Sequence, residues 1–229
     1  MIKDAGGYEA TPGDFAYAHV SDEDVLALEA RTKPLGFISR EQWDACRRGL
    51  LDALQRSGIN DADVRLKGSS TTFFSDNPDK YFPTSEDDAA TQARGSGLSE
   101  NGARTAWQVS PFSGHASAKL PRKHFWDSRF NLGIDTEKSD YDFQLSSDTL
   151  AVHLSWRYPD DRDETGRDVR SDHGGHYRDG LVKREFPALD EWAKEWSLAT
   201  GRQVNLASFS GKGPQEEGTR FKPDDWIVV

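Results

Sequence analysis

The sequence predicts an α+β fold in which helices pack on a mixed β-sheet. Segments with helical periodicity alternate along the chain with short segments in which every second residue is apolar. The chain carries neither the glycine fingerprint of dinucleotide-binding folds nor a Walker A sequence. Its 229 residues are enough to bury a sizeable core, and we expect one domain over residues 1–229 that contains a long insertion.

The first strong helix signal covers residues 40–56. Ser39 precedes it as an N-cap, and Gln42 follows three residues later as in a capping box. Its apolar stripe consists of Trp43, Cys46, Leu50, Leu51 and Leu54. Gly58 is expected to end the helix, and a strand with alternating apolar residues is expected over residues 64–67.

A Gly-Ser-Ser segment follows that strand and predicts a phosphate-binding site. Gly68 has no Cβ, so backbone N–H groups can approach a phosphate closely there, and Ser69 and Ser70 add hydroxyl donors. A helix that starts within residues 71–74 would favour an anion at its N-terminus. The alternative interpretation is an ordinary turn or helix cap, because Gly-Ser-Ser is common in both.

Residues 76–128 form the predicted insertion. They are rich in Gly, Ser, Thr, Asp and Pro, yet they also carry aromatic side chains. These are Tyr81, Phe82, Trp107, Phe112, Phe125 and Trp126. A fully solvated segment rarely carries so many rings, so we expect parts of it to dock on the core as a lid or acceptor-binding flap. A packed insertion without such a role is the alternative.

A second motif lies in the strand expected over residues 140–145. Alternation places Asp140, Asp142 and Gln144 on one face and the apolar residues between them on the other. Two carboxylates this close repel each other, and a divalent cation between them supplies the compensating charge. We therefore expect Asp140 and Asp142 to be ligands of Mg²⁺ or Mn²⁺.

The C-terminal third continues the alternation of helices and strands. Residues 147–158 fit a helix or a second strand equally well, because their apolar residues alternate while polar residues at the start resemble caps. A helix is expected over residues 187–200, with proline in its first turn and Gly201 at its end. A strand over residues 204–209 and an apolar run over residues 226–229 follow.

A strand ending in Gly-Ser, a helix, and a strand with Asp-x-Asp together resemble the signature of the DNA polymerase β-like nucleotidyltransferase superfamily. The matching residues are Gly68, Ser69, Asp140 and Asp142, within a resemblance that covers roughly residues 39–209. The resemblance implies a nucleotidyltransferase-like sheet on which the serine binds a nucleoside triphosphate and the aspartates hold Mg²⁺. It also implies transfer of a nucleoside monophosphate to an acceptor hydroxyl with release of pyrophosphate.

The family usually carries a third carboxylate on a later strand, and the corresponding candidate in this chain is Asn205. An amide can ligate a metal but cannot act as a base. Asp135, Asp148 and Glu185 are candidate substitutes for that base. The alternative function is therefore a catalytically degenerate protein of the same fold that binds a nucleotide or a partner without turnover.

Cationic and histidine side chains near residue 180 offer two further predictions. Arg178, Lys183 or Arg184 is expected to contact the triphosphate, because a cation stabilises the charge that develops on leaving pyrophosphate. His173 and His176 flank two glycines, and this spacing gives a third candidate function, a zinc-dependent hydrolase. Histidines at a glycine turn are more often simply exposed.

Composition limits the partners. The net charge of −10, from 39 acidic and 29 basic residues, argues against broad nonspecific binding to nucleic acid and favours a small-molecule or protein acceptor. The single cysteine, Cys46, lies on the apolar face of its helix, so we expect a buried hydrophobe rather than a nucleophile. No leader pattern and no apolar run of membrane-spanning length is found, so we expect a cytoplasmic protein without a membrane partner.

Overall fold

A computed structural model describes residues 2–4, 6–75, 77, 79–170, 176–211 and 226–229. It contains helices and one four-stranded sheet with mixed strand directions, which confirms the predicted α+β class for the described residues. The chain divides into two compact units. The first unit comprises Met1–Gly36 and Gly68–Ser139, and the second unit comprises Phe37–Lys67 and Asp140–Val229.

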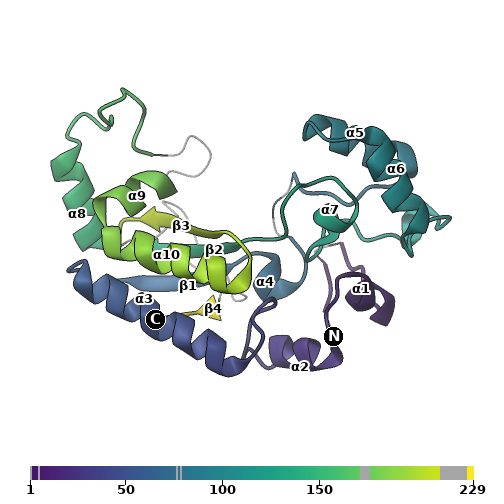
Figure 1. Cartoon of the computed structure of the whole chain (residues 1–229), viewed down its shortest axis with the longest axis horizontal. Coiled ribbons are helices and arrows are strands. Elements are labelled where there is room, and N and C mark those ends of the chain that lie inside the picture. The colour runs from purple at the N-terminus through teal and green to yellow at the C-terminus, as the bar shows by residue number, and fades with distance from the viewer. Residues whose placement is uncertain (1, 5, 76, 78, 171–175, 212–225) are drawn as a thin grey trace. The chain divides into compact units, whose positions relative to one another are not determined.

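The second unit contains the sheet, in the strand order β3-β2-β1-β4 (Figure 1). Its strands are β1 (Asp63–Lys67), β2 (Tyr141–Ser146), β3 (Val204–Phe209) and β4 (Trp226–Ile227). β1 is antiparallel to both β2 and β4, whereas β2 and β3 are parallel. Its helices are α3 (Arg40–Arg56), α8 (Asp148–Arg157), α9 (Asp179–Glu185) and α10 (Pro187–Thr200). The strands expected from the sequence are all present.

Helices α3 and α10 cover one face of this sheet, as Figure 1 shows. Phe143 of β2 packs between them, with its ring centroid 6.4 Å from that of Trp43 and 5.0 Å from that of Trp192. The indole Nε1 of Trp192 donates a hydrogen bond of 3.1 Å to the carbonyl oxygen of Cys46, so the two helices are also joined directly. Cys46 is buried, as predicted, and burial raises the pKa of its thiol. The opposite face of the sheet is thus free of these two helices.

Residues 147–158, for which the sequence allowed either a helix or a strand, contain the helix α8. Ser147 caps it, because its Oγ accepts the Leu150 N–H at 3.0 Å. Asp61 supports the cap, since its carboxylate accepts the Ser147 hydroxyl at 2.5 Å and the Thr149 N–H at 3.0 Å. The alternating apolar residues fit a strand, but they also fit a helix. Leu150 and Leu154, which are buried, are four residues apart and therefore share one face of a helix.

The first unit is built from short helices around aromatic rings. The helices are α1 (Pro12–Tyr17), α2 (Asp22–Glu29), α4 (Ser69–Thr72), α5 (Glu86–Gly95), α6 (Glu100–Val109), the 3₁₀ turn η1 (Ser117–Lys119) and α7 (Ser128–Asn131). Phe125 stacks on Phe73 and Phe82, with centroid distances of 5.1 and 5.6 Å. Phe15 and Tyr17, from the start of the chain, pack into the same cluster. Residues separated by a hundred positions therefore share one core.

The predicted insertion, residues 76–128, belongs to the first unit. Of its six aromatic side chains, only Tyr81 is largely exposed, at 51%. The buried five are Phe82, Trp107, Phe112, Phe125 and Trp126. These rings pack into the core of the first unit, which explains their presence in a segment of loop-like composition. A role as a lid or flap stays a prediction.

Candidate functional site

The two aspartates of the second motif start β2. Tyr141, Phe143 and Leu145 are fully buried in the helix-covered core, so the side chains that alternate with them belong to the opposite face. Asp140 is half-buried and directly precedes the strand, and Asp142 is exposed. The structure therefore confirms the alternation expected from the sequence and places both carboxylates on the face without α3 and α10.

Asn205 of β3 joins the two carboxylates. β2 and β3 are parallel, and their register places Asn205 beside Asp142. The amide Nδ2 of Asn205 donates a hydrogen bond of 2.8 Å to Asp140 Oδ2 and another of 3.2 Å to Asp142 Oδ1. One amide group thus brings both carboxylates together. The three residues predicted as catalytic form one cluster.

Lys67 lies on the other side of Asp142. It ends β1, and the antiparallel register of β1 and β2 makes it the direct partner of Asp142. Residues paired across neighbouring strands point to the same face, so this face carries an amide, a carboxylate and an ammonium in one row. Sequence analysis did not single out Lys67, although its position directly before the Gly-Ser-Ser segment was a signal that could have identified it.

The Gly-Ser-Ser segment begins the second stretch of chain in the first unit, Gly68–Ser139. Gly68 has φ +83°, a left-handed conformation that favours glycine, and it serves as the N-cap of α4. The helix expected to start within residues 71–74 in fact begins at Ser69 and ends at Thr72, because Phe73 leaves the helical conformation with φ +69°. Ser69 is half-buried, whereas Ser70 is buried and its carbonyl accepts the Leu35 N–H at 2.9 Å. Ser69 is the more accessible of the two serines.

Lys183 lies at the outer edge of β3 instead of extending into solvent. Its ammonium donates a hydrogen bond of 2.8 Å to the Val204 carbonyl and forms an ion pair of 2.8 Å with Asp179. The Asp179 carboxylate in turn accepts the Leu206 N–H at 2.8 Å. These contacts satisfy backbone groups on the edge strand, so the Lys183 side chain already has structural partners.

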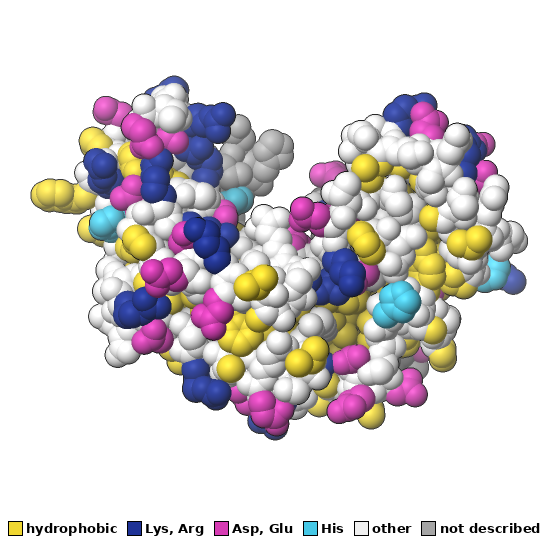
Figure 2. All heavy atoms as spheres, in the orientation of Figure 1, with side chains coloured by type: hydrophobic (Ala, Val, Ile, Leu, Met, Phe, Trp, Pro, Cys, Tyr) yellow, Lys and Arg dark blue, Asp and Glu magenta, His cyan; other side chains and the backbone are white. Residues whose placement is uncertain are grey.

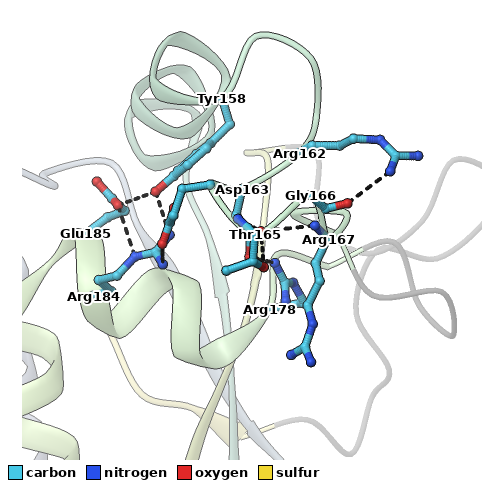
Figure 3. Close-up of polar contacts among 10 residues, drawn as sticks. Tyr158, Arg162, Asp163, Thr165, Gly166, Arg167, Arg178, Arg184 and Glu185 are labelled. Atoms are coloured by element: carbon cyan, nitrogen blue, oxygen red, sulfur yellow. Dashed lines mark hydrogen bonds and ion pairs between the residues drawn. The ribbon is translucent and has the colours of Figure 1, made fainter.

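The two arginines proposed beside Lys183 belong to a network of polar contacts around α8 and α9 (Figure 3). Arg178 forms an ion pair with Asp163, whose other oxygen accepts two hydrogen bonds from Thr165. These hydrogen bonds from Thr165, followed by the contact with Arg178, hold the pKa of Asp163 well below its usual range. Arg184 donates a hydrogen bond of 2.7 Å to the hydroxyl of Tyr158. Both guanidinium groups therefore stabilise this network.

The three candidate bases also have partners of their own. Asp135 receives a hydrogen bond of 3.3 Å from Arg129 in the first unit. Asp148 accepts the Gly211 N–H at 2.8 Å. Glu185 accepts the Tyr158 hydroxyl, which Figure 3 shows. None of these three contacts joins a candidate base to the Asp140–Asp142 pair, so among the described residues the hydrogen-bonded cluster consists of two carboxylates and one amide.

The zinc hypothesis falls partly on residues 171–175, which include His173 and lie outside the described residues. His176 is half-buried and lies against Phe209, with ring centroids 5.7 Å apart. Burial lowers its pKa, so its imidazole is neutral at pH 7. Among the described residues, no group of three or more His, Cys, Asp or Glu side chains is arranged to hold a metal ion.

The Asp140–Asp142 pair nevertheless fits a divalent cation that a nucleotide helps to bind. Mg²⁺ usually takes one or two protein carboxylates and completes its octahedron with water and substrate phosphates. The two carboxylates converge on one amide group, so their oxygens already point toward a common position. The amide of Asn205 can offer its carbonyl oxygen in place of Nδ2 by a rotation of its terminal group.

The surface charges around α8 and α9 are mixed. Acidic and basic side chains are interspersed on the face shown in Figure 2. Ion pairs contribute to this pattern, since Arg157, Arg178 and Arg184 each have an acidic partner. In the described part of the chain, no helix has the length and apolar character needed to cross a membrane.

Comparisons with protein-family models, curated proteins and solved structures give no match to this chain.

Proposed function

We propose that this protein is a Mg²⁺-dependent nucleotidyltransferase that moves a nucleoside monophosphate from a nucleoside triphosphate to an acceptor hydroxyl. The observation that carries the proposal is the bridging amide of Asn205, within 2.8 Å of Asp140 Oδ2 and 3.2 Å of Asp142 Oδ1. Two carboxylates held together on the sheet face opposite α3 and α10 form a site for a cation that also binds phosphates. The resemblance to DNA polymerase β-like nucleotidyltransferases, carried by Gly68, Ser69, Asp140 and Asp142, supports the same activity.

Asp140 and Asp142 would hold the cation, and Asn205 would keep their carboxylates in position. Bound Mg²⁺ would supply charge neutralisation at the α-phosphate, which is the main requirement of this chemistry. The acceptor hydroxyl then attacks the α-phosphorus and releases its proton to solvent, the bond between that phosphorus and the α–β bridging oxygen breaks, and pyrophosphate leaves. With these parts, catalysis is mostly positioning and electrostatic stabilisation.

The Gly68–Ser69 segment would bind the triphosphate. Lys67 is paired with Asp142, and Gly68 is the next residue along the chain, so the motif continues from the end of the strand beside the metal ligands. Gly68 adopts the left-handed conformation that brings backbone N–H groups to a tight turn. The Lys67 ammonium adds a positive charge on the same strand. We therefore assign the phosphates to Lys67, Gly68 and Ser69, with Ser70 supporting the segment from within the core.

The test is to incubate wild type, Asp140→Ala and Asp142→Ala with each α-labelled nucleoside triphosphate, Mg²⁺ and a cell extract. We expect label transfer and pyrophosphate release with wild type and a loss of more than about a hundredfold in each variant. Asp52→Ala is the matched control, because Asp52 is an exposed carboxylate that pairs with Arg56 at 2.8 Å on α3. Loss of transfer in the control as well would show a nonspecific effect.

The alternative is a protein of this fold that binds nucleotide without turnover. The specific observation in its favour is that Asn205, an amide, occupies the position next to the carboxylate pair. Isothermal titration with nucleoside triphosphate and Mg²⁺ separates the two functions. Binding that depends on Asp142, without any label transfer, would identify the degenerate protein. Binding that survives in both aspartate variants would show that the assigned site is wrong.

A further inference from the structure

The end of the insertion provides a group that can position Asp140. Asp127 and Ser139 form two reciprocal hydrogen bonds within the first unit. The Asp127 N–H donates to Ser139 Oγ at 2.9 Å, and the Ser139 N–H donates to Asp127 Oδ1 at 2.9 Å. Asp127 is only 5% exposed, so these bonds are shielded from water. Ser139 is bonded covalently to Asp140.

Asp140 needs such support because the strand does not include it. β2 begins at Tyr141, whose N–H donates a hydrogen bond of 2.9 Å to the Gln203 carbonyl. On the other side of Asp140, the chain passes through residues 132–139, where no helix or strand is found. The bonds to Asp127 therefore fix the last residue before the predicted metal ligand.

The same short segment also holds the end of the Gly-Ser-Ser helix. The N–H of Trp126 donates a hydrogen bond of 2.8 Å to the carbonyl of Phe73, which is the C-cap of α4. Phe73 and Asp127 have φ values of +69° and +57°, a conformation that costs energy for residues with a side chain. Such strain persists where the surrounding contacts determine the backbone, and it is concentrated at functional sites.

We propose that Asp127 is a positioning residue for the metal ligand Asp140, a role that rests on the proposed nucleotidyltransferase function. Asp127 acts through Ser139 and does not itself bind the cation. Trp126 and Asp127 together hold the end of α4 through Phe73 and the start of the Asp-x-Asp segment through Ser139. The insertion thereby contributes to both motifs through hydrogen bonds, without supplying a ligand.

The test measures Mn²⁺ affinity by electron paramagnetic resonance, with the nucleoside triphosphate that wild type uses, for Asp127→Ala, Ser139→Ala and the double variant. We expect each single variant to bind Mn²⁺ about tenfold more weakly, as is typical when support behind a metal ligand is lost. Asp127→Ala removes the Oδ1 acceptor of one bond and Ser139→Ala removes the Oγ acceptor of the other. The double variant loses both bonds, so it should bind Mn²⁺ more weakly than either single variant.

The variant Asp127→Asn tests whether Asp127 acts through its hydrogen bond to Ser139 or through its negative charge. Asparagine keeps the Oδ1 acceptor for the Ser139 N–H and tolerates a positive φ, so Mn²⁺ affinity should stay within about twofold of wild type. An affinity as low as that of Asp127→Ala would mean that the carboxylate charge itself is required, which overturns the positioning role.

Asp4→Ala is the matched control for a general loss of stability. Asp4 is also a buried carboxylate of the first unit, and it accepts the N–H groups of Gly6, Tyr8 and Arg122 at 2.8, 2.8 and 3.0 Å. We expect it to lower the thermal midpoint while Mn²⁺ affinity is retained. Equal affinity losses in Asp4→Ala and Asp127→Ala would reduce Asp127 to a structural residue. Wild type that binds no Mn²⁺ would instead overturn the proposed function, and the positioning role with it.

Discussion

Asn205 holds the side chains of two aspartates together. Repulsion between Asp140 and Asp142 is offset by an amide that donates to both carboxylates. A third carboxylate at that position would offer no donor. The residue that departs from the pattern of the resembled family is therefore the one that holds the cluster together in this chain.

Changing Asn205 to Asp should make the stability of the protein depend on metal. Three neighbouring carboxylates repel one another, so the thermal midpoint without divalent cations should fall by several degrees. Addition of Mg²⁺ should raise the midpoint more in Asn205→Asp than in wild type, since binding to the folded state stabilises it. Differential scanning fluorimetry across a Mg²⁺ titration measures both effects. A midpoint that is lowered but indifferent to Mg²⁺ would count against a cation site.

Because the His124 imidazole is buried, we expect the protein to lose stability in mild acid. It is 2% exposed, and burial, aided by the positive charges of Arg129 and Lys80, lowers its pKa to about 3. In the unfolded chain its pKa is about 6.5, so between these values only the unfolded state binds the proton. The contribution of His124 to the free energy of unfolding is therefore fully present above about pH 6.5. It falls as the pH decreases, by up to about 1.4 kcal/mol per pH unit.

Denaturant unfolding of wild type and His124→Gln between pH 7 and pH 5 measures this effect. His124 bonds to Ser128 Oγ at 2.9 Å and to Gln92 Oε1 at 3.1 Å, and glutamine can replace part of this bonding without titrating. The variant should be less stable at pH 7 but should show a shallower pH dependence. Equal slopes in the two proteins would assign the acid sensitivity to other groups.

At the scale of elements, side chains protect the edge of the sheet. β3 is an edge strand, and its outer backbone groups would be unpaired without the contacts of Asp179, Lys183 and Tyr177. The Tyr177 N–H donates to the Ser208 carbonyl at 2.7 Å, and α9 provides the other two partners. Protected edges resist pairing with other chains. The helix α9 thus has a structural function on the strand that carries Asn205.

The variant Lys183→Met tests whether the Lys183 side chain stabilises the edge strand β3 or binds the triphosphate. The Lys183 side chain is 17% exposed and donates to the Val204 carbonyl, so its loss should cost about 1–2 kcal/mol of unfolding free energy. Nucleotide affinity should change little. Calorimetry and nucleotide titration measure the two quantities. A large loss of affinity at unchanged stability would favour the predicted contact with the triphosphate.

At the scale of the whole molecule, the connection between β1 and β2 distinguishes this chain from a simple sheet protein. The two strands are antiparallel neighbours, which a short hairpin could join. Instead, the chain between them, Gly68–Ser139, combines with Met1–Gly36 to form the first unit. The insertion of residues 76–128 into a single domain stays a prediction, and the first unit also includes the start of the chain.

The second unit should therefore fold without the first. A chain that joins residues 37–67 to residues 140–229 through a short glycine-containing turn keeps all four strands and the α3–α10 pair. We expect cooperative unfolding and near-ultraviolet circular dichroism from Trp43 and Trp192, which pack on Phe143. Phe143→Asp in the same chain should abolish both signals. Residues 68–139 alone should not fold, because Phe15 and Tyr17 are missing from their aromatic core.

The sequence by itself determined the local elements with strong periodicity and clear end signals. α3 and α10 begin and end where the sequence predicted, because caps, proline and the residue after the helix act within a few positions. The alternation of Asp140 and Asp142 with buried residues was equally local. These features depend on neighbours in the chain, so they can be read from it.

Only the tertiary structure decided which distant residues meet. The sequence allowed a helix or a strand where α8 lies. Burial of Leu150 and Leu154 and the hydrogen bond of Asp61 with the capping residue Ser147 favour the helix. The bridging of Asp140 and Asp142 by Asn205 depends on the register of two parallel strands, and the bonds of Asp127 to Ser139 on the path of the insertion. Such contacts follow from packing across the fold, and no local pattern in the sequence specifies them.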